Sequence, residues 1–400
     1  MLKQIPVSSV VLGMYIHELC GSWMDHPFWK TGFLLDNPTD LQRLRQSSVT
    51  EVWIDVSKGL DAHEGVTQEQ ANQRAQSILA AANKQTEQSD LVSELQRAAN
   101  ICERSRDAVV SMFTDVRMGK AVDIQQVETA LNEMTESVMR HPGALISLAR
   151  LKQVDEYTYM HSVAVSALMM ALARQMQHDE EQMREAGLAG LLHDLGKMAI
   201  PESILNKPTS LTDTEFDRIR MHPLYGARYL KSGISSVSRE VQDACLHHHE
   251  KIDGSGYPHK LTHTEISLLS RMTAVCDVYD AVTSDRPYKK GWGPAEAIQR
   301  MAQWHGHFDP QIFQAFVRTV GIYPIGSLVR LASGRLGVVI EQDQNSLLKP
   351  KVKVFFSSKS KVPVEQEVID LASSRCNEEI VARERVEDWG FKNFDQLWME

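Results

Sequence analysis

Residues 187–197 read GLAGLLHDLGK, and this stretch indicates which kind of domain the chain contains. An apolar helical run ends in the adjacent pair His193 and Asp194, and Lys197 follows His193 at a spacing of one helical turn. Neighbouring His and Asp side chains near a helix end can face one metal ion, and the carboxylate keeps a second oxygen for another. Because an HD pair also occurs by chance, the prediction of a metal site depends on further residues.

Histidines and carboxylates elsewhere supply those residues. Of the 15 histidines, seven lie between His193 and His263, several of them beside acidic residues or at the ends of predicted helices. The additional candidate ligands are His161, His222, His248, His249 and Asp277. Asp277 falls in an apolar run, where a carboxylate has to be paired or metal-bound. Each residue alone has an ordinary structural explanation, such as a surface histidine or a buried hydrogen-bond acceptor, but the set predicts a metal centre.

Length and composition set the limits of this interpretation. A chain of 400 residues favours two or three domains, and 42% hydrophobic with 24% charged residues is typical of a globular protein. The net charge of −9 argues against nonspecific binding of nucleic acid. No run is long and apolar enough for a membrane helix, so we expect no membrane partner. Five scattered cysteines without a CxxC pair favour a reducing, cytoplasmic location.

The patterns divide the chain into four parts and predict a mainly α fold. We expect a small mixed α/β module at 1–65, a helical connector at 66–120, an all-helical catalytic domain at 121–321 and a β-rich extension at 322–400. The connector is interpreted either as a dimerising stalk or as a helix laid on the next domain.

Hydrophobic periodicity places the elements within these parts. The module is predicted to contain a strand-like stretch over 7–16 around the turn residue Gly13, a helix over 39–45 and a strand over 52–56. Helical patterns in the catalytic domain cover 122–141, 157–177, 180–195, 214–230, 238–249, 265–283 and 294–304. The extension is predicted to contain strands at 327–331, 337–341 and 351–356, packed on the helical domain.

The histidine and aspartate motifs, taken in order, resemble the HD-GYP domain over roughly half of the chain. The matching segments are HDLGK at 193–197, HP at 222–223, HHE at 248–250, DGSGYP at 253–258, DVYDA at 277–281, TSDRPYK at 283–289 and HFDP at 307–310. The stretch around 13–28 is similar to an uncharacterised module often found before HD-GYP domains.

This resemblance implies a phosphodiesterase that hydrolyses cyclic di-GMP to pGpG, and in many family members on to GMP, and so lowers this second messenger. It implies two divalent metal ions, with iron expected first and manganese or nickel able to occupy the same ligands. Asp194 is expected to bridge the two ions, with His161, His193 and Asp277 on one and His222, His248 and His249 on the other. Such a pair activates water and neutralises phosphate charge.

The resemblance also implies substrate contacts. Lys197 is expected at the phosphate or at the leaving oxygen, and Arg286 and Lys289 at phosphate oxygens. Gly256 would let the 253–258 loop approach the substrate, and Tyr257 would stack on a guanine or bind a phosphate. The same loop is alternatively expected to contact diguanylate cyclase domains, and the connector to form a homodimer.

One position departs from the family pattern. Some members carry a Glu four residues before the first His ligand, where it supports a third metal, but this chain has Tyr157 there. We therefore predict a binuclear site, and complete conversion to GMP stays open. Three alternatives are a non-catalytic cyclic-dinucleotide receptor, a hydrolase of cyclic GMP-AMP, and an HD phosphohydrolase acting on a nucleotide monophosphate or guanosine tetraphosphate. The complete ligand set argues against the first, and the GYP loop with His248 and His249 argues against the last.

Overall fold

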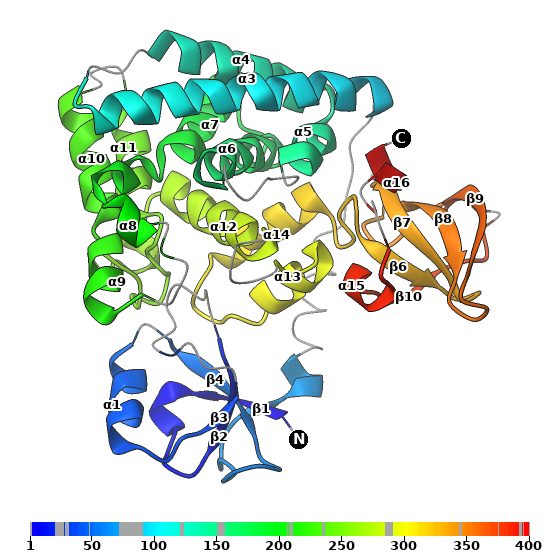
Figure 1. The fold of residues 1–400 in the computed structure, drawn as a ribbon, viewed down its shortest axis with the longest axis horizontal. Helices are drawn as coiled ribbons and strands as arrows, with labels where there is room; N and C mark the ends of the chain where they lie inside the picture. Colours follow the sequence, from blue (N-terminus) through cyan, green and yellow to red (C-terminus); the bar gives the residue numbers. More distant parts are fainter. Residues whose placement is uncertain are drawn as a thin grey trace.

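A computed structural model gives the arrangement of the three folded parts of the chain (Figure 1). It describes residues 2–20, 28, 32–47, 49–71, 91–120, 124–149, 157–205, 207, 211–233, 237–284, 291–343, 346–374, 376–391, 394 and 396–399. A helical domain lies in the centre, an N-terminal sheet lies against one end of it, and a C-terminal sheet lies beside it. The expected mainly helical fold with smaller parts before and after it is confirmed.

The N-terminal part is an antiparallel sheet with the order β3-β2-β4-β1-β5 in the described residues. Its elements are β1 (Leu2–Pro6), β2 (Tyr15–Leu19), β3 (Phe33–Leu34), α1 (Pro38–Gln46), β4 (Glu51–Asp55) and β5 (Val66–Thr67). The strand predicted before the turn residue Gly13 is wrong, because Val7–Ser9 forms a 3-10 turn. The turn itself is present, with a φ of 91° at Gly13, and the end of the predicted stretch lies in β2. Val7, Val10 and Met14 are buried, so the apolar spacing marks a loop that faces the core.

The N-terminal sheet meets the helical domain at the segment 300–305. Gln4, which is buried, donates from Nε2 to the carbonyl of Gln303 at 3.2 Å and to Oε2 of Glu51 at 2.9 Å. His305 Nδ1 lies 3.2 Å from the same Glu51 oxygen, and Arg300 pairs with Glu18. Polar contacts therefore hold the two parts together at the loop that precedes α14.

Helix α3 (Leu91–Arg117) lies across the helical domain and packs on α4, α5 and α6 (Figure 1). Ile101, Val109 and Phe113 on one side of this helix are buried in the domain's core. Helix α3 is therefore packed on the helical domain over 91–117. Residues 72–90, which hold much of the rest of the expected connector, lie outside the described residues.

The helical domain is built around two helices that are buried almost on all sides, α6 and α12. Because their apolar residues face every direction, neither helix has the polar face of a surface helix. The helices of the domain after α3 are α4 (Ile124–Arg140), α5 (Pro142–Ala149), α6 (Tyr157–Gln175), α7 (Glu180–Leu192), α8 (Glu202–Leu205), α9 (Asp213–Ile219), α10 (His222–Gly233), α11 (Arg239–His247), α12 (Leu268–Thr283), α13 (Pro294–Met301) and α14 (Pro310–Val320).

The single helix predicted over 214–230 is wrong, because the chain breaks between α9 and α10. Pro223 has no N–H to donate to the carbonyl four residues earlier, at Ile219, and its ring crowds that carbonyl. The freed oxygen of Ile219 lies 2.7 Å from Nδ1 of His222. The break therefore places His222 at the start of α10 and supplies the group that orients its ring.

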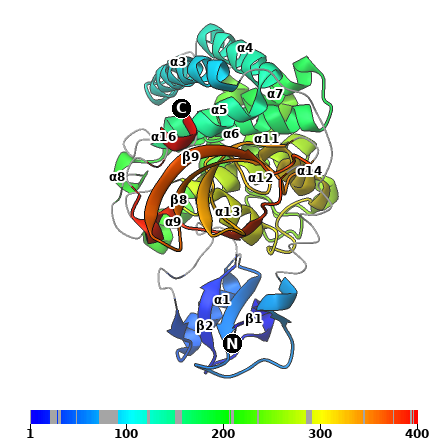
Figure 2. The same ribbon diagram turned by 90° about the vertical axis from the view of Figure 1, so that its right-hand side faces the viewer.

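The C-terminal part is a curved antiparallel sheet with the order β10-β6-β7-β8-β9 in the described residues (Figure 2). It comprises β6 (Leu328–Leu331), β7 (Arg335–Glu341), β8 (Lys351–Ser357), β9 (Val362–Asp370), β10 (Ile380–Arg383), α15 (Val386–Trp389) and α16 (Gln396–Met399). The three predicted strands are present, and β9 and β10 were not predicted. Arg383 donates to Oε1 of Gln299 on α13 at 2.8 Å, which ties the sheet to the helical domain. Among the described helices, none is long and apolar enough to span a membrane.

Candidate metal centre

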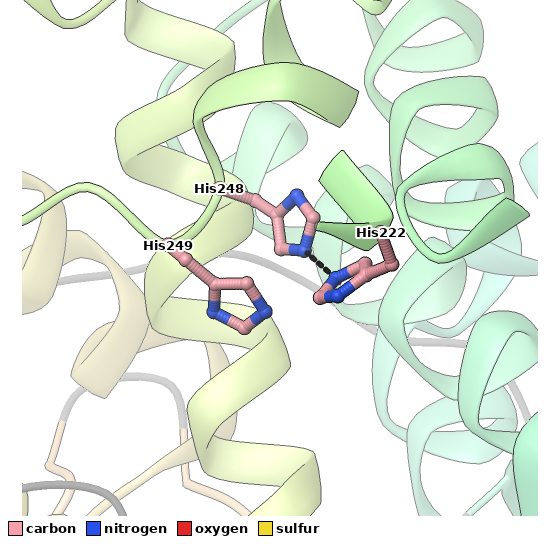
Figure 3. A group of neighbouring side chains, drawn as sticks. All are labelled: His222, His248 and His249. Carbon is pink, nitrogen blue, oxygen red and sulfur yellow. Dashed lines mark hydrogen bonds between the residues drawn. The ribbon is translucent and has the colours of Figure 1, made fainter. Parts of the chain in front are cut away.

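The predicted ligands are brought together from five helices or helix ends. His161 lies in α6 and Asp277 in α12, while His193 follows α7, His222 begins α10 and His248 follows α11. All seven side chains are buried or nearly so. Figure 3 shows His222, His248 and His249 pointing toward one another from two neighbouring segments.

These side chains form adjoining groups, each with ligand atoms within 4.8 Å of one another. One group is His161, His193 and Asp277, a second is His222, His248 and His249, and a third is His193, Asp194 and His248. Asp194 faces both of the first two groups: Oδ2 lies 3.3 Å from Nε2 of His193, and Oδ1 lies 3.3 Å from Nε2 of His222. The arrangement offers room for two neighbouring cations with one carboxylate between them.

Backbone carbonyls fix the orientation of three imidazole rings. Nδ1 of His193 lies 2.7 Å from the oxygen of Gly190, and Nδ1 of His248 lies 2.8 Å from that of Cys245. His222 makes the same contact with Ile219. Since a carbonyl can only accept, each Nδ1 carries a proton, and Nε2 is the nitrogen left to bind a metal in the neutral form of each ring. His193 differs from the other two, because Asp194 and Asp277 outweigh its burial and raise its pKa to about 10.

The short distance between the rings of His222 and His248 is consistent with a cation bound between them. Burial lowers the pKa of His222 to about 4 and that of His248 to about 3, so both rings are neutral near pH 7. Their Nε2 atoms nevertheless face each other at 3.2 Å, with both Nδ1 atoms committed as donors (Figure 3). Two lone pairs at this distance repel each other, and a shared or intervening cation relieves that repulsion.

The carboxylates of the centre lead to the same conclusion. Burial opposes ionisation of both carboxyls, but Lys197 and neighbouring histidines hold the pKa of Asp194 well below its usual range. His161 and His193 do the same for the pKa of Asp277. Oδ2 of Asp277 is buried and has no hydrogen-bond donor among the described residues. A buried anionic oxygen without a donor is costly, so the donor set fits divalent metal ions that bind nitrogen and oxygen.

Asp280 is a residue of the centre that the sequence interpretation missed. Its Oδ2 lies 2.6 Å from Nδ1 of His161, and the side chain is fully buried. This carboxylate sets Nδ1 of His161 as the donor and directs Nε2 toward Asp277, 3.0 Å away. The available signal was the second Asp one helical turn after Asp277 in a buried helix.

Glycine at position 196 allows the HD segment to approach α10. A Cβ at Gly196 would lie 1.9 Å from the carbonyl oxygen of His222 and 2.4 Å from the nitrogen of Gly226. The 3-10 turn Leu195–Ala199 therefore packs directly on the first turn of α10. Lys197, in this turn, extends its Nζ to within 2.5 Å of Oδ2 of Asp194, which places its charge at the centre.

The GYP loop packs on the histidine segment rather than standing free of it. A Cβ at Gly256 would lie 2.4 Å from the nitrogen of Lys251, so this glycine permits a close backbone contact inside the protein. Tyr257 is buried, and its ring stacks on His249 with centroids 4.7 Å apart. The loop thus supports His249. Arg286 and Lys289, and the side chain of Tyr157, lie outside what the structure describes.

A helical domain with adjoining buried groups of histidine and aspartate defines the HD class of metal-dependent phosphohydrolases. The sequence profile of the HD domain matches residues 131–312, and that of a domain of unknown function (DUF3391) matches residues 2–127. The chain is 59% identical over 402 residues to cyclic di-GMP phosphodiesterase PA4108 of Pseudomonas aeruginosa, an alignment that covers 100% of this chain and 96% of that protein. The chain belongs to the HD-GYP family.

Two further relatives match only part of this chain. Cyclic di-GMP phosphodiesterase response regulator RpfG of Xanthomonas campestris is 36% identical over 196 residues, covering 48% of this chain and 51% of its own length. The 3'3'-cGAMP-specific phosphodiesterase 1 of Vibrio cholerae is 36% identical over 166 residues, covering 41% and 38%.

Proposed function

We propose that this chain is a metal-dependent phosphodiesterase that hydrolyses cyclic di-GMP to pGpG. The observation that supports this function most strongly is that histidines from four separate segments of the chain surround the carboxylate of Asp194. The relative that aligns over the whole chain is named as a cyclic di-GMP phosphodiesterase, which supports the choice of substrate.

The ligand assignment follows the observed groups. His161, His193 and Asp277 would hold one divalent ion, and His222, His248 and His249 would hold the second. Asp194 would hold both, since its two oxygens face different groups at the same distance of 3.3 Å. We propose iron as the native metal, with manganese or nickel able to replace it, because imidazole and carboxylate ligands suit all three.

When bound, two such ions activate a water and neutralise charge on the phosphodiester. The protein's own groups position the reaction. Carbonyl oxygens and Asp280 hold the imidazole rings in place, so no ring has to reorient when substrate arrives. Lys197, whose Nζ lies beside Asp194, would bind a phosphate oxygen of the substrate or stabilise the leaving oxygen.

Further substrate contacts are proposed at Gly256 and Tyr257 of the GYP loop and at Arg286 and Lys289. Tyr257 already stacks on the His249 ring, so the contact we propose for it is through its hydroxyl. Asp253, His259 and Lys260 are the exposed residues of this region, and a diguanylate cyclase domain would bind there. Pairing of two chains through the connector is the proposed route to a homodimer.

The division into a module at 1–65, a connector at 66–120, a catalytic domain at 121–321 and an extension at 322–400 is retained as a proposal. A cytoplasmic location is proposed because all five cysteines are free, and Cys20, Cys102, Cys245 and Cys276 are buried. Cyclic GMP-AMP is the second candidate substrate, since a relative named as specific for it is 36% identical over 166 residues.

The test is a product assay on the chain purified without oxygen. Cyclic di-GMP and cyclic GMP-AMP are incubated with the wild type and with Asp194→Asn, and pGpG, GMP and the linear GMP-AMP product are separated by chromatography. We expect pGpG from the wild type and none from the variant. A metal-loaded wild type that binds cyclic di-GMP without cutting it would overturn the enzyme in favour of the receptor.

A further inference from the structure

Arg220 is a positively charged residue beside the metal centre for which neither the motifs nor the ligand assignment gives a role. It is the C-terminal cap of α9, and its backbone N–H donates to the carbonyl of Phe216 at 3.0 Å. It precedes His222 by two residues, at the break that Pro223 creates. Its position is therefore fixed by the same turn that begins α10 and directs His222 into the centre.

The guanidinium of Arg220 lies on an aromatic stack that leads to a proposed ligand. Its central carbon is 4.6 Å from the ring centroid of Tyr257 and 5.9 Å from that of Phe216. Tyr257 in turn stacks on His249 at 4.7 Å with an interplanar angle of 26°. The ring of Tyr257 therefore lies in contact with both the guanidinium of Arg220 and the imidazole of His249, a proposed metal ligand.

The donors of this guanidinium are free within the described part of the chain, where no carboxylate or carbonyl lies within ion-pair or hydrogen-bond distance of them. Lys197 differs, because its Nζ is taken up by Asp194. Arg220 is also only partly buried, so a ligand can reach it. A guanidinium that lies over an aromatic ring makes no hydrogen bond to it through its N–H edge, and that edge matches the two oxygens of a phosphate.

We propose that Arg220 binds the non-reacting phosphodiester of the cyclic dinucleotide while the metal centre acts on the other. This inference rests on the proposed function. A cyclic dinucleotide carries two phosphodiesters and therefore two negative charges, of which the centre addresses one at a time. Tyr257 holds the guanidinium in place, which gives the buried tyrosine of the GYP loop a role in substrate binding through Arg220.

The ordinary explanation is that the Arg220–Tyr257 contact only stabilises the loop. Cation–π pairs of this kind occur about once per 70–80 residues in proteins, so the stack alone does not decide between the two. A stabilising role would affect metal content and every substrate alike. A phosphate contact would affect the KM for a substrate with two phosphodiesters far more than turnover of a substrate with one.

The test compares Arg220→Gln with Arg218→Gln, an exposed arginine on the same helix, and with Arg220→Lys. Cyclic di-GMP and bis(p-nitrophenyl) phosphate, which has a single phosphodiester, serve as substrates for the metal-loaded protein. We expect Arg220→Gln to raise the KM for cyclic di-GMP by about tenfold to hundredfold. Its kcat and metal content should stay near the wild type, and the effect on bis(p-nitrophenyl) phosphate should be much smaller.

Salt dependence separates a phosphate contact from a contact with the edge of a guanine. An ionic contact weakens as salt screens it, so the KM of the wild type should rise with sodium chloride and that of Arg220→Gln should rise less. Equal salt dependence would assign Arg220 to the neutral base and overturn the proposal. An unchanged KM, or parallel loss of metal and of both activities in Arg220→Gln and Arg220→Lys, would also overturn it. If the wild type cuts only bis(p-nitrophenyl) phosphate, the failure lies with the proposed function.

Discussion

Oδ2 of Asp280 lies 2.6 Å from Nδ1 of His161, and this pair connects two helices of the metal centre. Asp280 is on α12, one helical turn after Asp277, while His161 is on α6. One face of α12 therefore supplies a proposed ligand and also the carboxylate that orients a ligand on the neighbouring helix. Such carboxylate–histidine pairs fix the ring and make its other nitrogen a stronger ligand.

The first prediction concerns this pair. Asp280→Ala leaves Nδ1–H of His161 without its acceptor, and we expect metal affinity to fall by about 10–100-fold. Metal content after dialysis against graded chelator measures the change. The matched control is Asp243→Ala, which removes a carboxylate 2.8 Å from Nδ1 of His247, a histidine outside the proposed ligand set. Equal metal retention in the two variants would contradict the role of Asp280.

The second prediction concerns Lys197. Lys197→Met removes the charge and keeps an apolar stem of similar length, so metal binding through the seven ligands should persist. We expect kcat for cyclic di-GMP to fall by about 10²–10³-fold, as for loss of one group that stabilises developing charge. Steady-state kinetics with metal analysis measure both quantities. Lys231→Met, an exposed lysine on α10, is the control. A variant with full kcat would remove Lys197 from the reaction.

The third prediction concerns the contact between the HD turn and α10. Gly196→Ala places a methyl against backbone atoms of His222 and Gly226 that cannot move aside easily. We expect destabilisation at the upper end of about 1–3 kcal/mol, together with weaker metal binding at the His222 group. Gly293→Ala is the control, since a Cβ there meets nothing within 4 Å. Thermal unfolding in chelator compares the folds without metal, and equal midpoints would refute the packing argument.

The fourth prediction is a pH dependence of stability set by Glu94, which joins α3 to α4. Burial opposes its charge, but hydrogen bonds from Arg140 at 2.8 Å and Ser137 at 2.9 Å lower the pKa of this carboxyl below its usual value. A lowered pKa in the folded state stabilises the protein above the usual pKa, and the stabilisation disappears as pH falls through the folded value.

Glu94→Gln should therefore lower the free energy of unfolding near neutral pH by about 1.5–3 kcal/mol, because it removes hydrogen bonds to a charged acceptor. The difference from the wild type should shrink as the pH is lowered below the usual carboxyl range. Urea unfolding at several pH values measures it, with the exposed Glu103→Gln on the same helix as control. A difference that does not vary with pH would contradict the assignment to the carboxylate charge.

The sequence predicted which residues would meet at the centre because histidine and aspartate at helix ends carry a recognisable spacing. His193, His222 and His248 each follow a residue whose carbonyl orients the ring, and the motif therefore includes the orienting group. Hydrophobic periodicity gave wrong helix and strand bounds where a turn or a proline interrupts the regular backbone. The 214–230 pattern continues through the break, and only Pro223 marks it. The turn at Val7–Ser9 keeps apolar spacing because Val7 and the following Val10 face the core.

Contacts between distant segments were not predictable in the same way. The stack from Arg220 to Tyr257 and His249 joins α9 to a loop more than thirty residues later, and no local pattern reports it. The substrate contact of Gly256 stays a prediction, whereas the close approach of its backbone to Lys251 was not predicted from the sequence. Both features depend on how α9, α11 and the GYP loop pack against one another. Such packing between distant segments leaves no recognisable pattern in the local sequence.

The central claim is that seven side chains hold two metal ions for phosphodiester hydrolysis. The most direct measurement is metal analysis of the anaerobically purified chain and of Asp194→Ala, with cyclic di-GMP turnover measured on the same samples. The account predicts about two metal ions per wild-type chain with pGpG formation, and loss of metal and of turnover together in the variant. A wild type that turns over cyclic di-GMP with no bound metal, or a variant that keeps both metal and activity, would contradict it.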